Sequence, residues 1–168
     1  IVFNDLFCLS DPRVHTISVG AARPSDLDLH LEAVAQLDRA AELMAPVQGR
    51  LEAAAVQALG PEWCRSWSTG LPAWHDTPGE LNLPVLLWLH NLLEAWDLES
   101  YAQARYRLLS NGGHWFAGAN ADALDDAVQE SELQAALVAS PWRDQIPDIL
   151  RGLKRRLAGE ANKRLSSV

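Results

Sequence analysis

Thr77-Pro78-Gly79-Glu80-Leu81-Asn82-Leu83-Pro84-Val85-Leu86-Leu87 has a counterpart later in the chain, Ser140-Pro141-Trp142-Arg143-Asp144-Gln145-Ile146-Pro147-Asp148-Ile149-Leu150. Each copy has a small hydroxyl residue, a proline, four further residues, a branched apolar residue and a second proline. Proline suits the start of a helix because its φ angle is preset and its missing N–H needs no partner there. We therefore predict that helices open at Pro84 and Pro147, each after an extended segment. Chance similarity is the alternative, but the shared positions favour a true repeat.

The composition limits the class of protein. The chain has 168 residues, about one domain, and is 48% apolar, so it can bury a core. Its net charge of −8 disfavours nucleic acids and anionic membranes as partners, because both select a basic surface. The basic residues 154–156 are explained by the favourable interaction of cations with the C-terminal end of a helix.

The cysteines and the start of the chain bear on its location. Cys8 and Cys64 belong to no disulfide or metal motif, which favours a reducing, cytoplasmic location. No apolar run approaches the roughly 18 residues of a membrane span. Ile1–Asn4 contains neither a methionine nor a signal-peptide pattern, so we expect the chain to be a piece of a longer protein.

The first residues predict a helix followed by a strand. Residues 2–10 have apolar positions at helical spacing and end before Pro12. Residues 14–20 alternate apolar and polar side chains, are rich in β-branched residues and end on glycine, which is typical of a strand. A lone strand cannot satisfy its own backbone groups, so its sheet must come from residues beyond this chain or from another chain.

The loop after this strand is the one site-like feature that the residues themselves indicate. Ser25 and Asp26 suit a helix N-terminus, and apolar residues recur at helical spacing from Leu27 to Leu37. A helix N-terminus beside Arg23 would attract an anion. The alternative is that Arg23 is a solvated loop residue and that Ser25 only caps the helix.

The rest of the chain predicts helices joined by loops. The helical segments are residues 39–59, with a break near Pro46, and residues 84–96, 98–109, 122–139 and 147–162. Residues 61–83 form a long, ordered loop that holds Trp63, Trp67 and Trp74. No basic groove accompanies these tryptophans, so we expect them to pack the loop onto the core and not to stack on bases. Residues 111–116 predict a turn-rich loop.

The sequence contains no established catalytic or metal-binding motif. The five histidines have no spacing that suits a metal, and His90, on the apolar helix 84–96, is expected to be a hydrogen-bonded core residue. His75 and Asp76 are adjacent in a loop, which does not make them a catalytic dyad. No nucleophile elbow, Walker A loop or dinucleotide-binding glycine motif occurs, and residues 111–113 are too short for a phosphate loop.

Residues 7–31 resemble the last helix–strand–helix unit of the aldo/keto reductase (β/α)8 barrel. Leu9-Ser10-Asp11-Pro12-Arg13-Val14 fits the family pattern L-S-x-P-x-V before the final strand. In that family, the loop after this strand and the start of the next helix hold the adenosine 2′-phosphate end of NADPH. The resemblance therefore implies a site for NADPH or NADH made by Gly20, Ala21, Arg23, Ser25, Asp26 and His30.

Two of these residues depart from the family pattern. Asp26 stands where Gln or Glu is usual, and His30 stands where Asn usually meets the adenine. A carboxylate beside a 2′-phosphate is repulsive, which tilts the expected cofactor towards NAD or towards lost binding. The family's catalytic Asp, Tyr, Lys and His lie on earlier strands of the barrel, so we expect no catalytic residue in this chain.

The second half resembles the helical ferredoxin-like domain that one branch of aldo/keto reductases carries after the barrel. That domain has two C-x2-C-x2-C-x3-C-P runs, and Thr77-Pro78 and Ser140-Pro141 fall on their C-P pairs. The other ligand positions fall on Trp67, Gly70, Ala73, Glu130, Leu133 and Ala136. None is a cysteine, and a [4Fe–4S] cluster needs thiolates, so no iron–sulfur cluster is expected. We expect Trp67, Trp74 and Leu133 to fill the volume of a cluster.

These patterns predict a mainly α protein in three segments. Residues 1–40 would be the end of the TIM barrel, 41–83 a connecting helix and Trp-rich loop, and 84–168 a degenerate ferredoxin-like helical domain. The implied function is that of the C-terminal fragment of an NAD(P)H-dependent aldo/keto reductase-like oxidoreductase. Its partners in the full protein would be the cofactor, a small carbonyl substrate and the rest of the barrel. The alternatives are a non-enzymatic helical module that binds a partner through the Trp-rich region, and a pseudo-enzyme.

Overall fold

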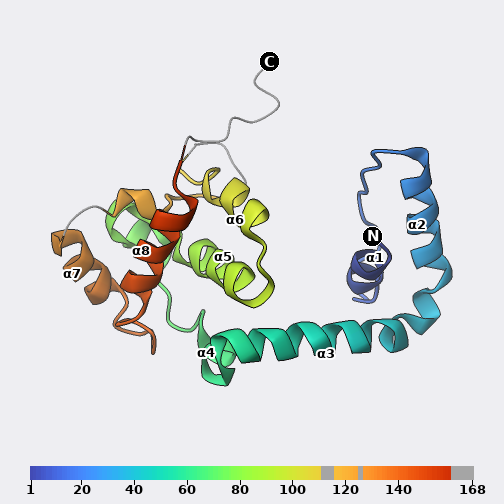
Figure 1. Ribbon diagram of the computed structural model, residues 1–168, viewed down its shortest axis with the longest axis horizontal. Helices are drawn as coiled ribbons and strands as arrows, with labels where there is room; N and C mark the ends of the chain where they lie inside the picture. Colours follow the sequence, from blue (N-terminus) through green and yellow to red (C-terminus); the bar gives the residue numbers. More distant parts are fainter. Residues whose placement is uncertain (111–115, 125–126, 160–168) are drawn as a thin grey trace, which may run out of the picture. The chain divides into compact units, whose positions relative to one another are not determined.

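The computed structural model describes residues 1–110, 116–124 and 127–159, and it is mainly helical (Figure 1). Contacts divide the chain into two compact units, Ile1–Ala53 and Ala54–Val168. The boundary falls within the long helix α3 (Ala40–Leu59). None of the described helices combines the length and the apolar character that a membrane crossing requires.

The first unit is built on two helices, α1 (Val2–Leu9) and α2 (Pro24–Ala35), which pack against each other. Their small core consists of Leu6, Ala33, Ala40 and Met44, with Val2, Phe3 and Leu43 packed against it. α2 begins at Pro24 because the preset φ of proline suits the first turn of a helix. α3 continues through Pro46, where the sequence predicted a break. Pro46 lies in the second turn, so only one early backbone hydrogen bond is lost.

Residues 14–20 do not form the predicted strand. They connect α1 to α2 (Figure 1), and no β-strand occurs among the described residues. Within the same described residues, no backbone hydrogen bond reaches positions 15–20. A strand needs a neighbour to pair with, and the described part of the chain provides none.

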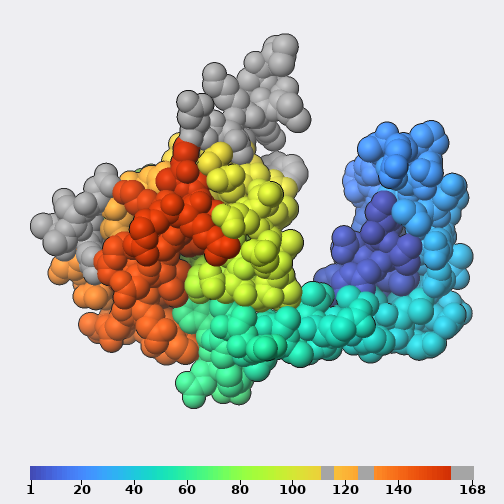
Figure 2. All heavy atoms as spheres, viewed as in Figure 1, coloured from blue at the N-terminus to red at the C-terminus, as the bar shows by residue number. Residues whose placement is uncertain are grey.

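The second unit contains helices α4 (Pro61–Ser66), α5 (Leu83–Trp96), α6 (Glu99–Tyr106), α7 (Ala127–Ala136) and α8 (Ile146–Leu157). α5 lies at its centre, and Leu83, Leu86, Leu87 and Leu89 are fully buried. α6 and α8 both pack against α5, and their surfaces adjoin in Figure 2. The apolar run that follows Pro84 therefore forms the core, as the sequence predicted.

The two prolines of the repeat stand at the second position of their helices, one position later than predicted. α5 begins at Leu83 and α8 begins at Ile146. The side chain of Asn82 accepts a hydrogen bond from the Val85 amide, 3.2 Å away, and so caps α5. Proline is tolerated at either position because the first N–H groups of a helix have no intrahelical partner.

Other helix boundaries differ from the predictions near the loops. The predicted helix 122–139 is replaced by a short 3-10 helix, Ala121–Ala123, and by α7. The loop 61–83 is ordered, as predicted, and contains α4 and the 3-10 helices Trp74–Asp76 and Pro78–Glu80. Most of the predicted loop 111–116 lies outside the described residues. α8 ends at Leu157, earlier than the predicted helix 147–162, and residues 160–162 lie outside the described part of the chain.

Candidate functional site

The loop between residues 20 and 26 closes on the carboxylate of Asp26. Arg23 has an extended backbone just before α2, with φ −136° and ψ 152°. Asp26 Oδ2 accepts hydrogen bonds from the backbone N–H groups of Ala22, at 2.9 Å, and Arg23, at 3.0 Å. The Arg23 guanidinium lies 3.7 Å from Asp26 Oδ1. The chain therefore supplies its own anion at the start of this helix.

The other predicted loop residues are open to solvent. Gly20, Ala21 and Ser25 are exposed, and a Cβ built at Gly20 would have nothing within 4 Å. The Arg23 side chain is 79% exposed, whereas that of Asp26 is only 14% exposed. The structure thus brings five of the six predicted cofactor residues into one accessible loop.

His30, the sixth predicted residue, contacts Asp5 of α1. Its Nδ1 lies 2.5 Å from Asp5 Oδ2, and both side chains are largely buried. His30 Nε2 is buried without a hydrogen-bond partner among the described residues. The sequence prediction missed Asp5, which is distant along the chain. The available signal was a carboxylate among the apolar positions of the first helix, where a buried charge needs a partner.

An apolar hollow of about 350 Å³ adjoins the Asp5–His30 pair in the first unit. Its wall includes Ile17 and Val19 from the extended segment and Leu27, Leu31 and Val34 from α2. Leu27, Leu31 and Val34 recur at helical spacing and are 49%, 68% and 58% exposed. We call these three residues the α2 stripe. An exposed apolar stripe beside unpaired backbone is typical of a surface that packs on another element.

These residues can be tested against the cofactor that the resemblance implies. A 2′-phosphate binds through free N–H groups at a helix start and through cations. Here the N–H groups of Ala22 and Arg23 already donate to Asp26, and Asp26 carries the same sign of charge as the phosphate. The loop therefore does not fit a 2′-phosphate. A carboxylate can instead accept hydrogen bonds from ribose hydroxyls.

In the second unit, the chain before the first repeat segment lies close to the start of the second repeat segment. A Cβ built at Gly70, which precedes the first repeat segment, would lie 2.1 Å from the carbonyl oxygen of Ala139 and 2.9 Å from the amide nitrogen of Ser140, the first residue of the second repeat segment. The 3-10 helix Pro78–Glu80 packs against α7, which precedes the second segment. The chain before the first repeat segment thus lies against the start of the second, and the 3-10 helix within the first repeat segment packs against α7.

The residues at the implied iron–sulfur positions do not fit a cluster. Thr77 Oγ1 donates to the carbonyl oxygen of Trp74 at 2.7 Å, and Ser140 Oγ accepts from the Trp142 amide at 3.2 Å. Both hydroxyls are buried and engaged, and neither supplies the thiolate that iron requires. The backbone contact at Gly70 also closes the gap between the two segments. Leu133 is buried in the hydrophobic core of the second unit, and Trp67 packs against that core. Trp74 does not belong to this hydrophobic core.

Tryptophans of the Trp-rich region pack and form hydrogen bonds within the second unit. Trp63 is 4% exposed and donates its indole N–H to Asn91 Oδ1 at 2.6 Å. The Trp142 indole N–H donates to Ser66 Oγ at 3.1 Å, and its ring lies edge-on to Trp63. The predicted packing role of Trp63 is confirmed, because its side chain joins α4 to the core helix α5.

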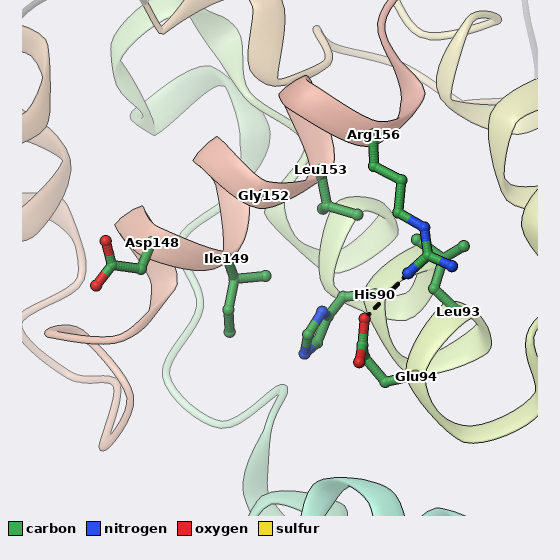
Figure 3. A pocket seen from close by; sticks show the side chains of 8 residues that line it. All are labelled: His90, Leu93, Glu94, Asp148, Ile149, Gly152, Leu153 and Arg156. Atoms are coloured by element: carbon green, nitrogen blue, oxygen red, sulfur yellow. Dashed lines mark hydrogen bonds and ion pairs between the residues drawn. The ribbon is translucent and has the colours of Figure 1, made fainter.

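A hollow of about 390 Å³ lies between α5 and α8 (Figure 3). His90 and Glu94 project from α5 towards α8, and Arg156 reaches back to Glu94 at 3.3 Å. Arg156 also pairs with Asp97 at 3.6 Å and Glu99 at 2.9 Å. Burial lowers the pKa of His90, and Glu94 opposes that shift, so the imidazole is neutral at pH 7. His90 is thus a pocket residue that packs edge-on against Trp63.

His75 lies in a loop, beside an acidic residue. His75 Nε2 lies 3.6 Å from Asp76 Oδ2, and both side chains are more than half exposed, so the two form no enclosed dyad. Among the described residues, no three His, Cys, Asp or Glu side chains lie close enough to hold a metal ion. Comparison of the chain with protein-family models, with curated proteins and with solved structures finds no match.

Proposed function

We propose that the chain is the C-terminal part of an aldo/keto reductase-like oxidoreductase. In this proposal residues 1–40 are the last helix–strand–helix of a (β/α)8 barrel, and their loop 20–26 contributes to a nicotinamide cofactor site. The second unit is a ferredoxin-like helical domain without iron–sulfur clusters. The full protein would transfer a hydride from the cofactor to a small carbonyl substrate, using catalytic residues outside this chain.

The observation that carries the proposal is the unpaired segment 14–20. It has a strand-like sequence, lies between two helices, and makes no backbone hydrogen bond at positions 15–20 within the described residues. The α2 stripe beside it is exposed. A parallel strand of a barrel pairs on both sides and buries the apolar face of its helix, which would satisfy both features at once.

The close approach of Gly70 to Ala139 and Ser140 supports the second part of the proposal. In two-cluster ferredoxin sequences, the fourth cysteine of each run ligates the cluster of the other run. Such sharing requires the start of one run to lie beside the end of the other, which is the relation of Gly70 to Ser140 here. The fold would then persist with buried hydroxyls and a direct backbone contact in place of the metal.

Hydrogen exchange tests the architecture of the first unit. The expected result is slow exchange at the amides of residues 15–19 in the full-length product of the reading frame, and fast exchange in the 168-residue chain alone. A matched control is the set of α5 amides, which should be protected in both proteins. Equal, fast exchange of residues 15–19 in the two proteins would contradict the barrel proposal.

Fluorescence titration with NADH and NADPH tests the cofactor part. Binding to the full-length product should quench protein fluorescence or shift the emission of the reduced nicotinamide. A pseudo-enzyme is the second candidate, because Asp26 and His30 are both engaged by the chain itself. Protected amides at residues 15–19 together with no binding of either cofactor would favour that candidate. A partner site in the Trp-rich region is not favoured, since Trp63 is buried.

A further inference from the structure

The hollow between α5 and α8, here called the α5–α8 hollow, has an apolar lining (Figure 3). Leu93 of α5 and Leu153 of α8 are buried, and Ile149 packs against the same core. Its volume of about 390 Å³ lies within the range of small-molecule pockets, which are mostly apolar and carry a few polar groups. The size and lining therefore suit the apolar part of a small ligand.

Gly152 leaves room on the α8 side of the hollow. It lies inside the helix, where glycine is less favourable than alanine. A Cβ built at Gly152 would have nothing within 4 Å, so no close approach of the described chain requires a glycine there. The glycine is better explained by the space that it leaves in the hollow than by packing within the chain.

His90 presents an imidazole without a hydrogen bond to the same hollow. Its ring lies edge-on to Trp63, with the centroids 5.6 Å apart, and the Trp63 indole is in turn held by Asn91. Within the described part of the chain, no hydrogen bond is made by the His90 ring nitrogens. Burial lowers the pKa of His90, so at pH 7 the neutral ring has one nitrogen that can accept a hydrogen bond.

The charges beside His90 favour a cation. Glu94 follows His90 by one helical turn on α5, and both side chains point towards α8. Arg156 is the cation opposite, and it lies 3.3 Å from Glu94, 3.6 Å from Asp97 and 2.9 Å from Glu99. Three carboxylates thus share one guanidinium, which leaves a net negative charge at this end of the hollow. An anion would find the guanidinium engaged and the carboxylates repulsive.

We propose that the α5–α8 hollow binds a small primary amine on an apolar stem. The stem packs on Leu93 and Leu153 over Gly152, and the ammonium lies between His90 and Glu94. An ammonium has three N–H donors, so it can donate to the imidazole nitrogen and to the carboxylate together. This site lies in the second unit and does not depend on the proposed oxidoreductase function.

The charge at the other end of the hollow does not change this preference. Asp148 lies at that end and pairs with Arg151. The two charges offset each other, so the local preference is set by the acidic residues around Arg156.

Titration of the 168-residue chain with 2-phenylethylamine near neutral pH tests the site. Backbone amide chemical shifts should change in a saturable way around His90 and Gly152, with a dissociation constant of about 1 mM or lower. 3-Phenylpropionate has a similar size and the opposite charge, and it should bind at least about tenfold more weakly.

Two variants test the space and the charge separately. Gly152→Met fills part of the hollow and leaves its charges in place, so the affinity for the amine should fall about tenfold or more. Glu94→Gln removes one negative charge and should weaken amine binding about threefold or more. Glu132→Gln removes the same charge from an exposed position of α7 that does not line the hollow, and it should bind as the wild type does. Circular dichroism checks that each variant is folded.

The inference is overturned if the wild type shows no saturable binding of the amine, or if it binds 3-phenylpropionate equally well. Unchanged affinity in a folded Gly152→Met variant would also overturn it. Should that variant not fold, Glu94→Gln decides the question, because unchanged affinity there contradicts a site beside Glu94. None of these results bears on the proposed cofactor site, which belongs to the first unit.

Discussion

The two units differ in how they satisfy their polar backbone and apolar side chains. In the second unit, Gly70 lets its backbone meet that of Ala139 and Ser140, and four leucines of α5, Leu83, Leu86, Leu87 and Leu89, are fully buried. In the first unit, residues 15–20 have no backbone hydrogen bond within the described chain, and the α2 stripe is exposed. The difference teaches that the second unit encloses its own core, whereas the first has the surface of a part that packs on another element.

The largest expected effect sharpens this contrast in apolar burial. Leu86 is 0% exposed, so Leu86→Ala should leave a cavity and lower the free energy of unfolding by about 2–5 kcal/mol. Leu31 in the α2 stripe is 68% exposed, and Leu31→Ala should change that free energy by less than about 0.5 kcal/mol. Urea denaturation of the 168-residue chain, followed by circular dichroism, measures both. Similar losses for the two variants would break the comparison.

The next largest loss of stability is expected at Gly70, where two parts of the backbone meet. Gly70 has φ +69°, and a Cβ there would lie 2.1 Å from the Ala139 carbonyl oxygen. Gly70→Ala should therefore lower the free energy of unfolding by about 2 kcal/mol or more, since both the backbone conformation and the space oppose a side chain. Gly20→Ala is the matched control, because nothing lies within 4 Å of its Cβ position. A neutral Gly70→Ala would mean that the segments do not meet as described.

A smaller and local effect is expected at the start of α2. Asp26→Ala removes the acceptor for the Ala22 and Arg23 amides and should cost about 1 kcal/mol of helix stability. Faster hydrogen exchange of those amides and of the first turn of α2 would report it. Asp28→Ala, on the same helix, should leave their exchange rates unchanged. Equal exchange rates in the two variants would contradict the hydrogen bonds from the Ala22 and Arg23 amides to Asp26.

The smallest expected effect is a pH dependence in the second unit. Because burial lowers the pKa of His90 in the folded state, the unfolded chain binds more protons at acidic pH. The contribution of the neutral, buried His90 to the free energy of unfolding is therefore fully present above the ordinary histidine pKa of about 6.5. It is lost as the pH falls below that value. His90→Gln should flatten this slope in denaturation curves between neutral and mildly acidic pH. An identical slope in the variant would show that other groups cause it.

Local sequence patterns predicted the helical elements well. The apolar spacing around Leu86 and the prolines 84 and 147 placed the starts of α5 and α8 to within one residue. These features act through contacts within a few residues, as in the φ angle of proline or the periodicity of a helix face. Pro46 is the exception, because its position early in α3 limits the cost to one hydrogen bond.

The sequence by itself determined that the chain is mainly helical and that α5 is buried, whereas the strand that it predicted at residues 14–20 does not form. Only the tertiary structure decided that Asp5 holds His30, that Asp26 fills the loop before α2, and that Gly70 touches Ala139. It also decided that residues 14–20 have no partner within the described chain. The physical reason is distance: propensity acts between near neighbours, whereas a buried side-chain hydrogen bond or a backbone contact joins residues that only folding brings together.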